Sequence, residues 1–239
     1  MTRQIIRVTG DDRLSFLQGL VTNDVTRAPC WAALLTPQGK YLADFLVIPE
    51  GGRLLIDVDD RLADDLLRRL SMYKLRSQVQ IAPTDLTVAR GIGDMPDAAI
   101  ADPRHPALGW RLYGARGDDG TDWDAIRVEH CIPESLIELI PNETYILEAG
   151  FERLHGVDFR KGCYVGQEVT ARMKHKTELK KGLVTVGIDG AAPVGTPILM
   201  PDGREAGTLY TQSGGRAIAH MRFDRMGDGL VAGDARILP

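Results

Sequence analysis

The sequence predicts an α+β fold, in which a body of mixed helices and antiparallel sheets is followed by a small antiparallel β-barrel. Helical and strand-like patterns alternate over residues 1–180, whereas residues 181–239 contain only short strand patterns separated by Gly, Pro, Asp and Ser clusters. With 239 residues, 44% of them hydrophobic, the chain can bury a sizeable core. We therefore predict two domains, 1–180 and 181–239.

Local patterns predict each element in turn. A helix follows the turn at residues 9–12, and the clearest helix spans 61–73, where apolar side chains recur at helical spacing. Its apolar stripe consists of Leu62, Leu66, Leu70 and Tyr73. A third helix over 123–131 ends before Pro133, because the residue preceding a proline disfavours the helical conformation. Strands are predicted at 3–8, 31–35, 41–48, 54–58, 79–81, 86–89 and 110–115, and barrel strands at 183–188, 197–200, 206–211 and 217–221.

Composition and charge exclude several classes of protein. No apolar run is long enough to span a bilayer, and the N-terminal residues lack the apolar core of a signal peptide. The formal net charge of −4 argues against DNA or other nucleic acid as a partner. Three widely spaced cysteines without a Cys-x-x-Cys pair fit free thiols in a reducing compartment and give no metal-ligand spacing. We predict a cytoplasmic protein that binds neither a membrane nor a metal ion.

The most informative segment is KGCYVGQE, residues 161–168, in which two glycines bracket a cysteine and a tyrosine. Glycines permit backbone angles or close approaches that a side chain would forbid. Cys163 lies between Lys161 and the start of a predicted helix, and both the cation and the helix dipole favour a thiolate. The alternative is a small core cysteine without chemistry.

Together with Ala171 and Arg172, this segment resembles the signature of the YgfZ family. These are folate-binding proteins of the glycine-cleavage T-protein (aminomethyltransferase) superfamily, implicated in iron–sulfur cluster assembly and repair. Three further segments resemble the superfamily's first helix and Thr-Asn-Asp turn, its hairpin ending on an acidic residue, and the segment whose glutamate clasps a pterin ring. They are residues 16–25 (FLQGLVTNDV), 34–44 (LLTPQGKYLAD) and 126–133 (IRVEHCIP). Asn23 and Asp24 are expected to shape a turn rather than to bind a ligand.

The resemblance implies a T-protein-like folate-binding body and a set of site residues. Glu129 would accept two hydrogen bonds from the guanidine-like edge of the pterin. Asp44 would be the second acid of the pocket, where a buried carboxylate can hold positive charge or move a proton. Tyr164 and Arg172 complete the cofactor-binding set. The residues alone favour another interpretation, with Glu129 at an exposed helix position and Asp44 as a solvated acid at a strand end, because a lone Asp or Glu is nearly always on the surface.

These features predict a protein that binds tetrahydrofolate, or another reduced folate, and assists iron–sulfur cluster assembly or repair in client enzymes. Its partners would be folate and iron–sulfur client or assembly proteins. The T-protein usually carries an acidic residue where Cys163 stands, which favours the YgfZ branch. Because a cluster usually needs four protein thiolates, Cys163 could ligate one only together with a partner chain or a small thiol.

Two rival predictions use the same residues differently. One is a folate-dependent aminomethyltransferase of the glycine-cleavage T-protein type, with Asp44 as the catalytic acid–base group. The other is an interaction module that has lost folate and depends on Cys163 alone. The sequence leaves open whether the protein catalyses any turnover.

Overall fold

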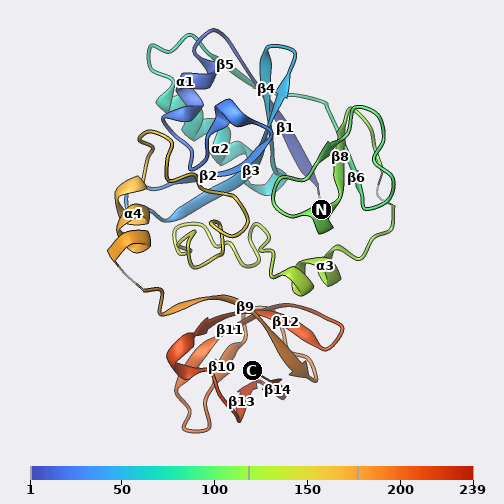
Figure 1. Ribbon diagram of the computed structural model, residues 1–239, viewed down its shortest axis with the longest axis vertical. Coiled ribbons are helices and arrows are strands. Elements are labelled where there is room, and N and C mark those ends of the chain that lie inside the picture. Colours follow the sequence, from blue (N-terminus) through green and yellow to red (C-terminus); the bar gives the residue numbers. More distant parts are fainter. Residues whose placement is uncertain (1, 118, 177, 239) are drawn as a thin grey trace. The chain divides into compact units, whose positions relative to one another are not determined.

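The computed structural model describes residues 2–117, 119–176 and 178–238 (Figure 1). The chain divides into two compact units. The first comprises Met1–Thr121, Pro141–Glu143 and Phe151–Ala171, and the second comprises Asp122–Ile140, Thr144–Gly150 and Arg172–Pro239. Among the described residues, no helix is long and apolar enough to cross a bilayer.

A five-stranded antiparallel sheet forms the centre of the first unit, in the order β2-β3-β4-β1-β5. Its strands are β1 (Arg3–Thr9), β2 (Cys30–Leu35), β3 (Tyr41–Glu50), β4 (Arg53–Asp59) and β5 (Gln80–Pro83). Strand β2 and most of β3 are buried residue after residue, as expected where both faces of a strand are covered. The register places Val47, Ile56 and Ile6 in one buried row across three strands.

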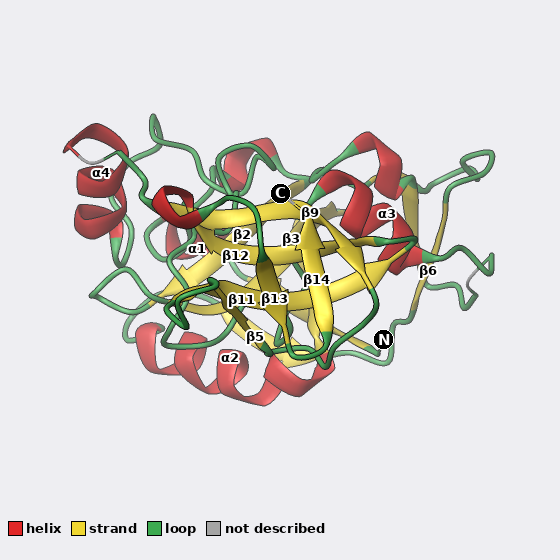
Figure 2. Ribbon diagram, turned by 90° about the horizontal axis from the view of Figure 1, so that it is seen from below, coloured by secondary structure: helices red, strands yellow, loops and turns green. Residues whose placement is uncertain are grey.

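Helix α2 (Asp60–Tyr73) packs against β1, β4 and β5 of this sheet (Figure 2). The Asp59 carboxylate caps its first turn by accepting a backbone hydrogen bond. The three leucines of the predicted stripe are buried, whereas Tyr73 is exposed at the end of the helix. Three further helical elements are α1 (Arg13–Gln18), the short η1 (Val25–Arg27) and α4 (Gln167–Lys176).

A buried charge network joins the large sheet to a second sheet of the first unit, which has the order β6-β8-β7. The elements of this part are β6 (Val88–Gly91), β7 (Ile100–Ala101), η2 (Pro106–Leu108) and β8 (Trp110–Tyr113). Asp57 in β4 accepts hydrogen bonds from Arg3 at 2.6 Å and from Arg111 in β8 at 3.0 Å. Arg111 also pairs with buried Asp102 at 2.9 Å. Burial raises the pKa of Asp57, but the two ion pairs outweigh it and hold that pKa below its usual range.

Replacing Asp57 with Asn should therefore destabilise the fold. Removing one member of a buried ion network leaves charge uncompensated, which costs about 3–5 kcal/mol. Because the folded-state pKa is lowered, the stabilisation that Asp57 provides is present at neutral pH and is lost only as the pH falls below about 4. Urea unfolding at pH 7 and pH 3 measures both effects. The exposed Asp64→Asn variant is the control, and equal stability of the two variants at pH 7 would refute the prediction.

The second unit is built around a closed six-stranded barrel, in the order β10-β11-β12-β9-β14-β13 (Figure 1). Its elements are β9 (Lys181–Asp189), β10 (Pro197–Leu199), β11 (Glu205–Ser213), β12 (Arg216–Arg222), η3 (Phe223–Arg225), β13 (Leu230–Ala232) and β14 (Ala235–Leu238). Apolar side chains such as Ile198, Leu209 and Met221 fill the interior. Helix α3 (Trp123–His130) packs against β11 and β12. The predicted barrel is confirmed, with two more strands, β13 and β14, than the sequence patterns indicated.

Candidate functional site

The lysine of the KGCYVGQE segment faces the protein interior. The buried Lys161 ammonium donates hydrogen bonds to the backbone carbonyl of Gln18, at 2.6 Å, and to that of Val21. Burial lowers the pKa of Lys161 to about 8, although nearby acidic groups oppose the shift. The ammonium also lies 5.1 Å from the centre of the Tyr164 ring. Lys161 thus fastens the segment to the end of α1, and its ammonium is engaged by backbone carbonyls.

The second glycine of the segment packs against the turn between β2 and β3. Gly166 has φ of +83°, and a Cβ atom added to it would lie 2.6 Å from the Thr36 carbonyl oxygen. From the opposite side, a Cβ atom on Gly39 would lie 2.9 Å from the Val169 Cβ. Two segments that the sequence marks separately, the hairpin turn and the KGCYVGQE segment, therefore contact each other within the first unit. Their close approach explains why glycine stands at both contact points.

The two glycines of the segment should respond very differently to substitution. Gly166→Ala combines a left-handed backbone with a steric clash, so it should lower the free energy of unfolding by about 2 kcal/mol or more. Gly162→Ala is the matched control, because no atom lies within 4 Å of its added Cβ. Chemical denaturation of the two variants measures the difference. Equal stabilities would contradict the packing described here.

Cys163 is the exposed member of the three cysteines, all of which are free. Cys30 is buried, and burial raises its pKa to about 12, so its thiol stays protonated at neutral pH. Cys131 is partly buried and ends α3 with φ of +51°. Cys163 lies four positions before α4 begins at Gln167. The interpretation of Cys163 as a small core residue is therefore wrong, and its thiol is accessible to a partner molecule.

Asp44 is a buried carboxylate in β3, with 3% of its surface exposed. The Trp31 indole N–H donates to Oδ2 at 2.9 Å, and the Tyr41 hydroxyl donates to Oδ1 at 2.7 Å. Trp31 is held in turn by stacking on Phe151, with ring centroids 3.9 Å apart. The alternative of a solvated acid at a strand end is thus wrong. A carboxylate fixed in this way can hold a positive charge or exchange a proton with a bound molecule.

Tyr164 carries a buried hydroxyl that makes no hydrogen bond of good geometry among the described residues, although the Thr170 hydroxyl lies close enough to lower its pKa in part. The side chain is only 7% exposed, and burial raises the pKa of Tyr164 to about 12. The hydroxyl is therefore a neutral donor at physiological pH. Because a buried polar group without a partner is costly, this hydroxyl is the kind of group that a ligand atom would satisfy.

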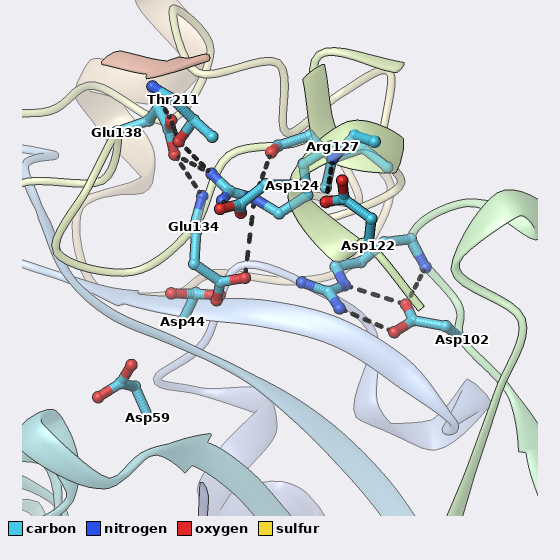
Figure 3. Close-up of polar contacts among 12 residues, drawn as sticks. Asp44, Asp59, Asp102, Asp122, Asp124, Arg127, Glu134, Glu138 and Thr211 are labelled. Carbon is cyan, nitrogen blue, oxygen red and sulfur yellow. Dashed lines mark hydrogen bonds and ion pairs between the residues drawn. The ribbon is translucent and has the colours of Figure 1, made fainter. Parts of the chain in front are cut away.

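Helix α3 turns Arg127 and Val128 inward and leaves Glu129 exposed. The exposure of Glu129 agrees with the alternative interpretation, in which it is an exposed helix position. Its contact with a pterin stays a prediction. The most deeply buried acid among the described residues of this unit is Glu138, which binds the Arg127 guanidinium at 2.5 Å and the Thr211 hydroxyl at 2.6 Å (Figure 3). Sequence reasoning missed Glu138, although a lone acid within the apolar run 136–140 was a usable signal.

The predicted site residues are divided between the two units. Asp44, Cys163 and Tyr164 belong to the first, whereas Glu129 and Arg172 belong to the second. Arg172 is exposed on α4. No group of three or more potential metal ligands occurs among the described residues.

A cavity of about 440 Å³ in the first unit was not predicted. Its wall includes Asn23, Cys30 and His155. The Asn23 amide donates to the Trp31 and His155 carbonyls at 2.7 and 2.6 Å, so it links the backbones on two sides of this wall, and its expected role in a turn stays a prediction. The cavity has the size of a small-molecule site. It escaped prediction because its wall combines segments more than a hundred residues apart in the sequence.

Comparisons with known proteins agree with this fold. A family model described as the CAF17 C-terminal beta-barrel domain matches residues 180–239. The solved structure of the glycine cleavage system aminomethyltransferase T from Bartonella henselae superposes with a TM-score of 0.72, covering 99% of this chain and 83% of that one at 12% identity. The chain therefore has an aminomethyltransferase-like fold with a C-terminal closed barrel, as predicted.

Curated relatives are named as iron–sulfur cluster assembly factors. The mitochondrial factor IBA57 of Mus musculus is 30% identical over 237 residues, which cover 80% of this chain and 66% of the relative. The homologue from Mycosarcoma maydis is 32% identical and is covered to 54%, and that of Homo sapiens is 28% identical and is covered to 74%. The chain thus spans between about half and three quarters of these relatives. The relatives are named as mitochondrial, and a cytoplasmic location of this chain stays a prediction.

Proposed function

We propose that this chain is an iron–sulfur cluster assembly factor of the folate-binding YgfZ type. The observation that carries the proposal is an exposed thiol, Cys163, on a segment whose backbone is fixed on both sides of it. Lys161 anchors the segment to the end of α1, and Gly166 anchors it to the hairpin turn. The assembly role in the names of the IBA57 relatives supports the same function.

In this function Cys163 contacts an iron–sulfur cluster, or a thiol that carries one, while the cluster passes to a client enzyme. One thiolate cannot hold a cluster alone, since such clusters usually need four. Cys30 is buried and protonated, so it does not supply a second ligand. The remaining ligands come from a partner chain or a small thiol. The partners of this chain are thus iron–sulfur assembly or client proteins.

The first unit offers groups that suit a reduced folate such as tetrahydrofolate. The buried Asp44 carboxylate suits the cationic or N–H-rich edge of a reduced pterin, and the Tyr164 hydroxyl is a buried donor in need of an acceptor. When bound, a reduced folate supplies one-carbon chemistry. The parts of Asp44 and Tyr164 are to bind and orient it. Glu129 and Arg172 enter the proposal through the sequence resemblance alone.

Replacing Tyr164 with Phe separates a ligand-binding role from a structural one. If the hydroxyl binds folate, Tyr164→Phe should weaken tetrahydrofolate binding about tenfold, because a hydrogen bond contributes roughly 0.5–1.5 kcal/mol. The same substitution should leave the free protein as stable or more stable, since it removes a buried unsatisfied group. Anaerobic calorimetry and thermal unfolding measure the two effects. A loss of stability with unchanged folate affinity would show that the hydroxyl is structural.

A second candidate function is folate-dependent aminomethyl transfer. It is favoured by the burial of Asp44 and by its two fixed hydrogen bonds, which suit an acid–base group. The two functions make opposite demands on Cys163. If the chain is a transferase, Cys163→Ser should still act on tetrahydrofolate and an aminomethyl donor. The activity is measured as release of ammonia or formation of methylenetetrahydrofolate. An absence of turnover in the native chain, with folate bound, would leave the assembly function.

A further inference from the structure

The turn after α2 presents apolar side chains to solvent. Leu75 is 88% exposed, Met72 is 66% exposed and Tyr73 is 39% exposed. All three lie within four consecutive residues, at the end of α2 and in the turn that follows it. We refer to residues 72–76 as the α2 turn surface. Exposed apolar side chains concentrated in one short segment mark it as an interaction surface to test.

The backbone of the α2 turn surface is fixed in a conformation that is unfavourable for leucine. Leu75 has φ of +44°, in the left-handed region that glycine adopts without penalty. The turn is closed by a backbone hydrogen bond from Ser77 N–H to the Lys74 carbonyl at 2.8 Å. It is tied to the start of α1 because the Asp12 carboxylate accepts from Gln78 N–H at 2.7 Å. The leucine side chain is therefore held out in water by a defined turn, and such strain is concentrated at functional sites.

Two unpaired cations flank the exposed leucine. Within the described part of the chain, neither the Lys74 ammonium nor the Arg76 guanidinium forms an ion pair or a side-chain hydrogen bond. By contrast, Arg68 and Arg69 on α2 both pair with Asp65. Asp11 lines the adjacent hollow, and the Asp12 carboxylate beside it is engaged by the backbone of Gln78.

A hollow of about 590 Å³ lies between the turn at Gly10 and Asp11 and the segment 74–80. A second hollow lies along Asp12, Leu75, Arg76 and Ser77. Leu75, Arg76 and Ser77 line both, so an apolar and a cationic group border each hollow. A segment bound at this surface would find room for its side chains in both hollows.

We propose that the α2 turn surface docks an acidic segment of a partner protein. Apolar side chains of that segment cover Leu75 and Met72, and its carboxylates pair with Lys74 and Arg76. The charge of the surface selects the partner, because unpaired cations beside exposed apolar groups match acidic residues interspersed with apolar ones. The surface consists of one short segment, so the contact is a transient one. This inference does not depend on the folate or cluster functions.

The test uses the full chain and a displayed library of random twelve-residue peptides. Peptides selected on the native chain are counter-selected on a Leu75→Gly variant and on a Lys74→Glu/Arg76→Glu double variant. Leu75→Gly removes the side chain while relieving the left-handed backbone, so it should unfold at the same temperature as the native chain or higher. An Arg116→Glu/Lys180→Glu variant carries the same charge change at two exposed positions and is the matched control.

The expected result is enrichment of peptides in which aspartate or glutamate flanks leucine or phenylalanine. The best of these, measured by fluorescence anisotropy, should bind both variants of the α2 turn surface at least about tenfold more weakly than the native chain, and should bind the control variant equally well. The proposal is overturned if basic or uncharged peptides are enriched, or if no peptide distinguishes the native chain from the variants. It is also overturned if anionic phosphatidylglycerol vesicles or a second copy of the chain bind this surface in place of the peptides.

Discussion

Replacing Cys163 with serine should abolish the support that this chain gives to iron–sulfur enzymes. In cells that lack the native gene and carry the variant, the activity of cluster-containing enzymes should fall to the level of the deletion. Enzymes without a cluster should be unaffected. The physical reason is that a serine hydroxyl does not replace a thiolate as a ligand of iron or as a partner in thiol exchange.

The fold should not change in this variant. Cys163 is exposed, and surface substitutions away from packed features usually leave stability nearly unaltered. Unfolding temperature and tetrahydrofolate affinity should therefore match those of the native chain. Cys131→Ser is the matched control, since Cys131 is a cysteine of the second unit, outside any disulfide, that the proposal does not use. Full enzyme activities with Cys163→Ser would refute a role of this thiol in cluster assembly.

Replacing Asp44 with Asn should weaken tetrahydrofolate binding by about 10- to 100-fold, because a hydrogen bond to a charged group contributes roughly 1.5–3 kcal/mol. The substitution removes the negative charge and leaves the shape of the side chain almost unchanged. It also places an amide NH₂ group against the donors of Trp31 or Tyr41, which both need an acceptor. A moderate loss of stability is therefore expected alongside the loss of affinity.

The two effects of Asp44→Asn can be separated. Binding is measured by anaerobic calorimetry at a temperature at which unfolding curves show the variant to be fully folded. Tyr41→Phe removes one donor to Asp44 but keeps the charge, so it should bind folate nearly as well as the native chain. If Asp44→Asn binds tetrahydrofolate normally, the buried carboxylate serves the fold and the folate site lies elsewhere.

The parts of the fold that could be predicted from the sequence are those determined by local residue patterns. The spacing of Leu62, Leu66 and Leu70 determines the buried side of α2, and the glycine-containing turn at 36–40 determines the hairpin of β2 and β3. Tyr73 is the one member of the predicted apolar stripe that is exposed. It is the last residue of α2, where the helix extends beyond the sheet that covers the leucines. The short even spacing of strands after residue 181 predicted the barrel for the same local reason.

Features that depend on distant parts of the chain could not be predicted. Lys161 is buried because carbonyls about 140 residues earlier accept its hydrogen bonds, and Asp57 is buried because Arg111 reaches it from another sheet. The KGCYVGQE segment was identified by its composition, yet its contact with the hairpin turn is a property of the folded chain alone. For this reason the sequence indicated Cys163 as a candidate but did not predict the burial of Lys161.

Anaerobic calorimetry of tetrahydrofolate binding tests whether the chain has a folate site separate from its exposed thiol. The native chain, Cys163→Ser, Asp44→Asn and Glu129→Ala are titrated under the same conditions. We expect one molecule to be bound by the native chain and by Cys163→Ser, and much weaker binding by Asp44→Asn and by Glu129→Ala. If the native chain does not bind tetrahydrofolate, the proposed folate site does not exist.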